Sequence, residues 1–219
     1  MKEAKFHVKG IILDLDGTLV DSKEAYSEAA KAAFSAFGVE GINSKTVIEI
    51  PKRFEQGIPF DDLAPGINVE KFRRIYLRAY YDATAVKTRP FPNIANTLKR
   101  LSEKAKLALT TRRNVPRKKV VDQLEKLGLA RYFQAVVTAG DMVNPKPSPD
   151  AIIECARKMG LKPIDCAVVG DSVVDVEAGK RAGAKTVAVL SGIFSREELQ
   201  GEKPDLILEN VTKLPDFLE

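Results

Sequence analysis

The chain of 219 residues carries 35 Lys and Arg against 30 Asp and Glu, a formal charge of +5, with 44% apolar and 30% charged residues. This balance is typical of a globular protein with a sizeable core, and it excludes the disordered and fibrous classes. The basic excess is spread along the chain, so we expect no nucleic-acid partner, whereas a small anionic ligand would suit it.

The residue types present also limit location and chemistry. There are two cysteines, Cys155 and Cys166, the first residues have no apolar signal core, and no stretch approaches the ~18 apolar residues of a membrane span. We therefore expect a cytoplasmic protein with no membrane partner. The single histidine, His7, argues against a histidine metal cluster or a Ser-His-Asp triad. Any chemistry must rest on carboxylates, hydroxyls, lysine and arginine.

Short apolar runs alternate with amphipathic stretches along much of the chain. Nearly continuous Val, Ile and Leu runs are typical of the buried strands of a parallel sheet, which helices cover on both faces. The pattern predicts an α/β protein with a Rossmann-like open parallel sheet. The predicted strands are 10–13, 107–111, 135–138, 167–169, 186–190 and 206–208, and the predicted helices of this part are 115–127, 149–159 and 173–182.

The interval between the first and second predicted strands is too long for a simple crossover. It exceeds 90 residues, whereas a crossover needs about a dozen or slightly more. Apolar residues recur at helical spacing twice within it, after Asp21-Ser22 and again around Phe72 and Tyr76. We predict a helical cap domain over residues 21–88, inserted into a catalytic core made of residues 1–20 and 89–219.

Polar residues follow four of the predicted strands. Ligands of open α/β sheets bind beyond the carboxyl ends of the strands, so these groups are expected to meet in one crevice. On a strand, residues two apart point to the same side, which would let two carboxylates flank one reacting atom. The segments are Asp14-Leu15-Asp16-Gly17-Thr18, then Thr110-Thr111-Arg112-Arg113, then Lys146 between two prolines, and finally Asp171 with Asp175.

Taken in this order, the four segments resemble the haloacid dehalogenase superfamily in its phosphatase branch, which includes enzymes similar to phosphoglycolate phosphatase and β-phosphoglucomutase. The resemblance implies that Asp14 is the nucleophile and Asp16 the general acid and base. It also implies that Thr111 and Lys146 bind the phosphoryl oxygens. The inserted segment would correspond to that family's helical cap.

The resemblance further implies a Mg²⁺ site. Asp14 and Asp171 would hold the ion through their carboxylates and Asp16 through its backbone carbonyl, with Asp175 as a nearby supporting acid. Electrostatics agrees with this expectation, because a carboxylate that attacks an anionic phosphoryl group meets like-charge repulsion unless cations offset it. Mg²⁺ and the Lys146 ammonium would supply them.

The second segment departs from the family pattern at Arg112, where Asn or a small residue is common. Arg112 is a candidate substrate-binding residue, and Arg112 and Arg113 would either contact an anionic substrate or lie solvated in a loop. The family register favours Thr111 over Thr110 as the phosphoryl ligand, and a shift by one residue stays open.

The function expected from these residues is Mg²⁺-dependent hydrolysis of a small phosphate monoester through an aspartyl-phosphate, similar to phosphoglycolate phosphatase. One alternative is a phosphosugar mutase of the same superfamily. Another is a non-catalytic, receiver-like binding module, which would leave the long insert and Asp16 unexplained. The core motifs do not separate phosphatase from mutase, and the sequence predicts neither the ester nor the oligomeric state.

Overall fold

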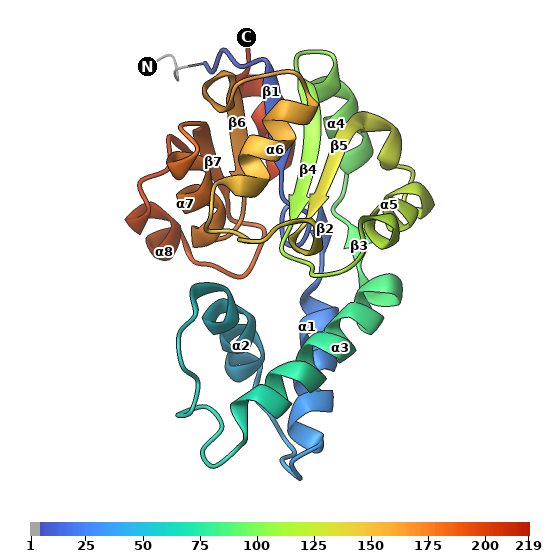
Figure 1. Ribbon diagram of the computed structural model, residues 1–219, viewed down its shortest axis with the longest axis vertical. Helices are drawn as coiled ribbons and strands as arrows, with labels where there is room; N and C mark the ends of the chain where they lie inside the picture. Colours follow the sequence, from blue (N-terminus) through green and yellow to red (C-terminus); the bar gives the residue numbers. More distant parts are fainter. Residues whose placement is uncertain (1–4) are drawn as a thin grey trace. The chain divides into compact units, whose positions relative to one another are not determined.

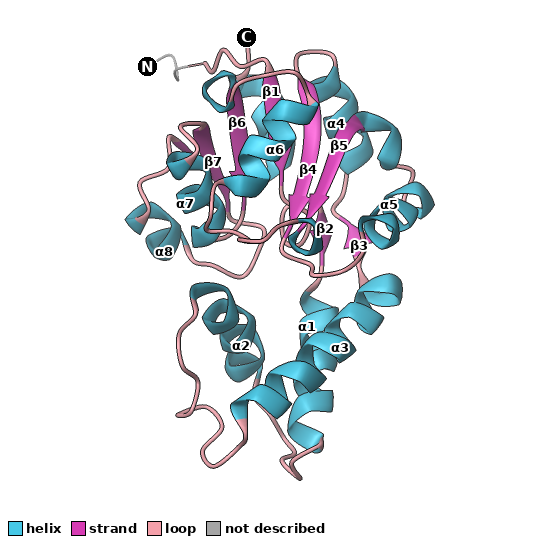
Figure 2. Cartoon of the chain, viewed as in Figure 1, coloured by secondary structure: helices cyan, strands magenta, loops and turns pink. Residues whose placement is uncertain are grey.

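The computed structural model describes residues 5–219, which divide into two compact units. One comprises residues 5–20 and 90–219, and the other residues 21–89. Figures 1 and 2 show the first as a sheet covered by helices and the second as helices alone. The assignment of these units as a catalytic core and a helical cap domain stays a prediction.

The first unit is built on a six-stranded parallel sheet in the order β5-β4-β1-β6-β7-β8. Its strands are β1 (Gly10–Leu13), β4 (Lys106–Thr111), β5 (Phe133–Thr138), β6 (Cys166–Gly170), β7 (Lys185–Val189) and β8 (Leu206–Leu208). Its α-helices are α4 (Ile94–Ser102), α5 (Arg117–Lys126), α6 (Asp150–Lys158), α7 (Val173–Arg181) and α8 (Arg196–Gly201). Short 3₁₀ turns lie at Ala130–Tyr132, Ala139–Asp141, Pro163–Asp165 and Val211–Phe217. The predicted α/β fold with an open parallel sheet is confirmed.

Alternation of side chains along the central strand divides the core into two layers. Ile11 and Leu13 of β1 pack on one face, among residues of α4 and α5, while Ile12 faces the opposite layer, among residues of α6 and α7. This alternation follows from the two-residue period of a strand, and burial on both faces explains why the strands read as continuous apolar runs. Figure 2 shows helices on both faces of the sheet.

The second unit contains α1 (Lys23–Ser35), α2 (Ser44–Gln56) and α3 (Val69–Lys87). Aromatic rings form its interior: Phe34 meets Phe72 edge to face at 4.9 Å between ring centroids, and Tyr26 stacks on Tyr80 at 5.1 Å. Two of the helices begin with asparagine caps, in which the Asn43 side chain accepts from the Thr46 N–H and the Asn68 side chain from the Lys71 N–H, each at 2.8 Å. Such caps satisfy amide groups that the first helical turn leaves unpaired.

Two short strands, β2 (Val20–Asp21) and β3 (Arg89–Pro90), pair with each other in the connecting segments. Ser22 occupies the cap position of α1, where its side chain makes no capping hydrogen bond, while Asp21 Oδ1 accepts from the Lys23 N–H at 3.0 Å.

Candidate active site

The carboxyl ends of the central strands bring the predicted residues of the first, third and fourth segments together. Asp14 follows β1 directly, its backbone N–H bonds to the carbonyl of Val169 on β6 at 2.9 Å, and Asp171 follows β6. Strand β1 lies between β4 and β6, where the order of connections reverses direction. Such a reversal point is where open α/β sheets bind their ligands.

Lys146 lies at the centre of this group. Its ammonium donates to Asp14 Oδ1 and to Asp175 Oδ1, each at 2.5 Å, although the lysine reaches the site from the segment before α6. Only 3% of the Lys146 surface is exposed. A buried ammonium needs carboxylate partners, because removal of a charge from water is costly unless it is paired.

Asp175 is held at the start of α7. Its Oδ2 accepts from the Ser172 hydroxyl at 2.9 Å and from the Ser172 N–H at 3.3 Å, which together form a capping box. Its other oxygen receives Lys146. Both carboxylate oxygens are therefore engaged by protein donors, which suits a residue that orients the lysine.

Asp171 is packed tightly against backbone. Its Oδ1 accepts from the Thr18 hydroxyl at 2.9 Å. A Cβ added to Gly17 would lie 2.3 Å from Asp171 Oδ2, and one added to Gly192, just after β7, would lie 1.7 Å from the same atom. The Ser191 hydroxyl donates to the Gly17 carbonyl at 2.6 Å and ties the two loops together. Glycine at both positions is what leaves room for this carboxylate.

Carboxylates outnumber cations in the buried cluster. Ligand oxygens of Asp14, Asp171 and Asp175 lie within 4.8 Å of one another, and Lys146 is the ammonium bonded to two of them. Burial, reinforced by the charge of Asp175, raises the pKa of Asp14 well above its ordinary value even though Lys146 opposes the shift. Burial acts to lower the pKa of Lys146, but Asp14 and Asp175 outweigh it and the net pKa is raised.

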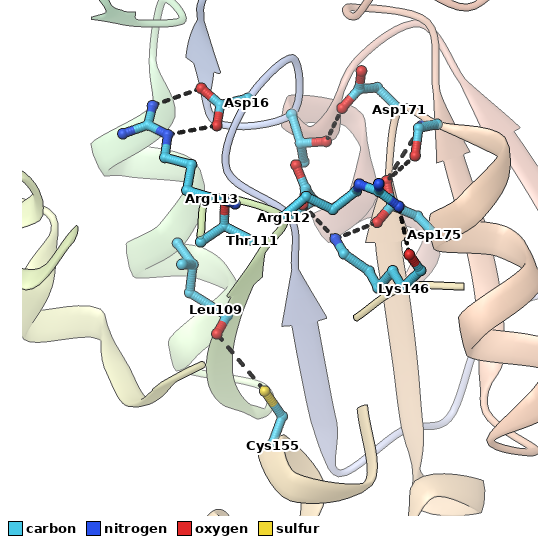
Figure 3. Close-up of polar contacts among 12 residues, drawn as sticks. Asp16, Leu109, Thr111, Arg112, Arg113, Lys146, Cys155, Asp171 and Asp175 are labelled. Carbon is cyan, nitrogen blue, oxygen red and sulfur yellow. Dashed lines mark hydrogen bonds and ion pairs between the residues drawn. The ribbon is translucent and has the colours of Figure 1, made fainter. Parts of the chain in front are cut away.

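Asp16 takes a different partner from the other three acids. Arg113 Nη2 donates to Asp16 Oδ1 at 2.6 Å and Arg113 Nε to Oδ2 at 2.7 Å (Figure 3). The side chain of Arg113 is only 4% exposed. Of the two interpretations left open for Arg113, a solvated loop residue is therefore wrong.

Thr111 and Arg112 lie beside this group. The Thr111 hydroxyl accepts from the Arg113 N–H at 3.2 Å, while the buried Thr110 hydroxyl has no hydrogen-bond partner among the described residues. Arg112 Nη1 donates to the backbone carbonyl of Lys146. This contact ties the loop after β4 to the segment that carries the lysine, and a role of Arg112 in substrate binding stays a prediction.

Sequence reasoning missed several residues that shape the site. Ser172 could have been found, because Ser172 and Asp175 have the spacing of a capping box. Thr18 lies within the quoted first segment but was given no role. Ser191 and Gly192 follow a strand end that carries no charged residue, so no side-chain chemistry marked them.

Comparison with known proteins identifies the family to which the chain belongs. Residues 11–189 match the family model of haloacid dehalogenase-like hydrolases. The chain therefore belongs to this family and is a hydrolase, which confirms the family resemblance drawn from the four segments. Among helices of residues 5–219, none is long and apolar enough to cross a membrane.

Curated relatives narrow the similarity to phosphatases. The chain is 31% identical to phosphoglycolate phosphatase from Escherichia coli (strain K12) over 231 aligned positions, covering 94% of this chain and 91% of that protein. The fold is similar to that of a haloacid dehalogenase-like hydrolase from Streptococcus pneumoniae, with a TM-score of 0.79, 23% identity and coverage of 96% of this chain and 98% of that one. It is also similar to a structure from Thermotoga maritima provisionally assigned as a β-phosphoglucomutase, with a TM-score of 0.68, 22% identity and coverage of 95% and 97%.

The donor set fits a divalent metal of the kind this family uses. All three cluster residues offer carboxylate oxygens, and hard oxygen donors are what Mg²⁺ prefers. Lys146 pairs with two of the three carboxylates, and a divalent cation would add the positive charge that suits a cluster of three acids. The cluster contains Asp14 and Asp171 of the predicted set. It contains Asp175 in place of Asp16, whose predicted contribution was its backbone carbonyl.

Proposed function

We propose that the protein hydrolyses a small phosphate monoester, similar to phosphoglycolate, in a Mg²⁺-dependent reaction through an aspartyl-phosphate. The observation that carries the proposal is the buried group of Asp14, Lys146, Asp171 and Asp175 at the carboxyl end of the central strands. The curated relatives support a hydrolase that acts on phosphate esters.

The proposed first step is attack by Asp14. One of its carboxylate oxygens bonds to phosphorus while the bond from phosphorus to the ester oxygen breaks. Asp16 in its protonated form gives its proton to the departing oxygen, so the products are an alcohol and the phosphorylated Asp14. Lys146, whose ammonium lies 2.5 Å from Asp14 Oδ1, holds the nucleophile and would offset the negative charge of the phosphoryl oxygens.

The proposed second step regenerates the enzyme. Asp16, now a carboxylate, takes a proton from water as the water oxygen attacks phosphorus. The bond between phosphorus and Asp14 breaks, and inorganic phosphate leaves. Thr111 and Arg112 are the candidates for contacts to phosphoryl or substrate oxygens, since both belong to the segment that ends β4 and begins its loop.

We propose Asp14, Asp171 and the backbone carbonyl of Asp16 as the residues that hold Mg²⁺, with Asp175 as the orienting partner of Lys146. When bound, the ion neutralises charge on the phosphoryl oxygens and on the attacking carboxylate. Both oxygens of Asp175 already accept protein hydrogen bonds, which supports its orienting role.

A panel of phosphate esters tests the proposal. The protein is incubated with Mg²⁺ and phosphoglycolate, glycerol phosphate, sugar phosphates and p-nitrophenyl phosphate, with release of inorganic phosphate as the readout. We expect turnover of at least one small ester and its loss in Asp14→Asn. Absence of phosphate release across the panel would refute the proposed function, while transfer of phosphate to a second sugar position without release would identify a mutase.

A further inference from the structure

The Asp16 carboxylate is fully engaged by one guanidinium. Nη2 and Nε of Arg113 meet its two oxygens at 2.6 and 2.7 Å, in the parallel two-bond geometry that makes such pairs strong and directional (Figure 3). The Asp16 side chain is 11% exposed, so little water competes for these bonds.

Arg113 is itself fixed on its other sides. Nη1 donates to Gln123 Oε1 on α5 at 2.5 Å, and the Arg113 backbone N–H donates to the Thr111 hydroxyl at 3.2 Å. These contacts from α5 and from the end of β4 favour one position of the guanidinium. While the pair is formed, the position of Arg113 determines where the Asp16 carboxylate lies.

In this arrangement both oxygens of the Asp16 carboxylate are occupied by Arg113, which leaves neither free for the work of a general acid. Such a group must bring a carboxyl oxygen within hydrogen-bond reach of the departing oxygen and later of water. Here both oxygens accept from Arg113, and the Asp16 carboxylate does not belong to the cluster formed by Asp14, Asp171 and Asp175. Asp16 must leave the pair and take up a proton from water before it can act as the general acid.

We propose that Arg113 is a positioning residue that holds Asp16 in a resting arrangement, from which the side chain is released when a phosphoryl group occupies the site. The proposal rests on the proposed phosphatase function. The pair compensates the charge of the largely buried Asp16 carboxylate. Release then sets the fraction of bound enzyme that can protonate a leaving group, and this fraction scales kcat/KM for the esters that need such a proton.

The kinetic test compares two leaving groups. An alkyl ester such as glycerol phosphate or phosphoglycolate needs a proton on its departing oxygen, whereas p-nitrophenolate departs without one. We expect Arg113→Met to raise the alkyl-to-aryl ratio of kcat/KM at least threefold, Arg113→Lys to raise it less, and Asp16→Asn to lower it. In an Asp16→Asn background, Arg113→Met should leave the ratio unchanged, because Arg113 acts through Asp16.

Arg117→Met is the matched control, since Arg117 also pairs with an aspartate, Asp141 at 3.1 Å, but its side chain is 47% exposed. Its ratio should equal that of the wild type. An unchanged or lower ratio in Arg113→Met, or the same change in the Asp16→Asn background, overturns the proposal. Arg113→Lys keeps the positive charge and replaces the methionine variant if that variant does not fold. An unchanged or lower alkyl-to-aryl ratio in Arg113→Lys would then overturn the proposal.

A measurement without turnover separates this proposal from the proposed function. The side-chain Nε–H of Arg113, identified by its loss in Arg113→Lys, is followed by nitrogen NMR before and after addition of Mg²⁺ and beryllofluoride. We expect a shift and faster exchange with water on addition, and the same fast exchange in Asp16→Asn alone. A signal that stays protected while the Asp14 backbone signal shifts overturns the proposal. Wild-type protein that releases no phosphate from any ester refutes only the proposed function.

Discussion

A methyl group at Gly192 should disable the proposed metal site without replacing any charged residue. An alanine Cβ at this position would lie 1.7 Å from Oδ2, 2.3 Å from Cγ and 2.6 Å from Cβ of Asp171. Cβ atoms essentially never approach other heavy atoms closer than 3.0 Å, so the contact to Oδ2 must open by at least 1.3 Å. Rotation of the carboxylate alone does not relieve this overlap, because the Asp171 Cβ also lies too close.

The expected magnitude follows from this displacement. Mg²⁺ demands near-ideal octahedral geometry at about 2.0–2.1 Å, and a misplacement of about 1 Å in a catalytic site can cost about 10²-fold. We expect Gly192→Ala to weaken Mg²⁺ binding at least tenfold by isothermal titration calorimetry and to lower kcat/KM about 10²-fold. The backbone of Gly192 has no positive φ, so alanine itself introduces no strain there.

Gly201→Ala is the matched control. Its added Cβ would meet no atom within 4 Å, so Mg²⁺ affinity and turnover should equal those of the wild type. Asp171→Ala provides the reference for a lost metal ligand. The reasoning would be refuted if Gly192→Ala, folded by circular dichroism, bound Mg²⁺ and turned over substrate within twofold of the wild type.

Other predictions concern the acids of the site and the thiols. Asp14→Asn should abolish phosphate release and acid-stable labelling by a phosphate ester while leaving circular dichroism unchanged, and residual turnover above a few per cent would contradict a covalent mechanism. EDTA should remove activity and Ca²⁺ should inhibit, because its looser coordination misplaces the nucleophile, whereas full activity in chelator would contradict the metal requirement. Asp175→Asn should lower kcat and also the thermal midpoint, because one residue serves Lys146 and the start of α7; a change in only one of these would contradict the shared role. Burial raises the pKa of Cys155 to about 12 and that of Cys166 to about 11, so both thiols should react with a disulfide reagent only on unfolding, and fast labelling of the native protein would contradict this.

Prediction from sequence worked best where one physical signal governs the structure. The predicted strand at residues 10–13 is β1, and the strand predicted at 107–111 differs from β4 by one residue at its start, because burial on both faces leaves a continuous apolar run. The helix over residues 94–102 was missed, although its apolar residues face one side. Pro90 and Pro92 lie shortly before it, and such closely spaced prolines are typical of a stiff connector, which hides the start of the helix.

In the candidate active site, sequence predicts which residues come together but not how their side chains pair. Strand ends are local features, so Asp14, Lys146 and Asp171 could be expected in one place once a parallel sheet was inferred. The pairing of Asp16 with Arg113 could not, because it joins residues 97 apart and depends on which way the arginine turns after β4. Periodicity does not encode that direction.

The hydrogen bonds of Asp175 couple the formation of α7 to the assembly of the candidate active site. One oxygen of this residue closes the capping box with Ser172, and the other receives Lys146 from a segment 29 residues earlier in the chain. In a chain in which α7 is not yet formed, Asp175 is therefore not positioned to accept the hydrogen bond from Lys146. The site can therefore form only in a chain in which α7 is folded. In hydrogen exchange, the amides in the first turn of α7 and those in the loop that carries Lys146 should open together, as one cooperative unit.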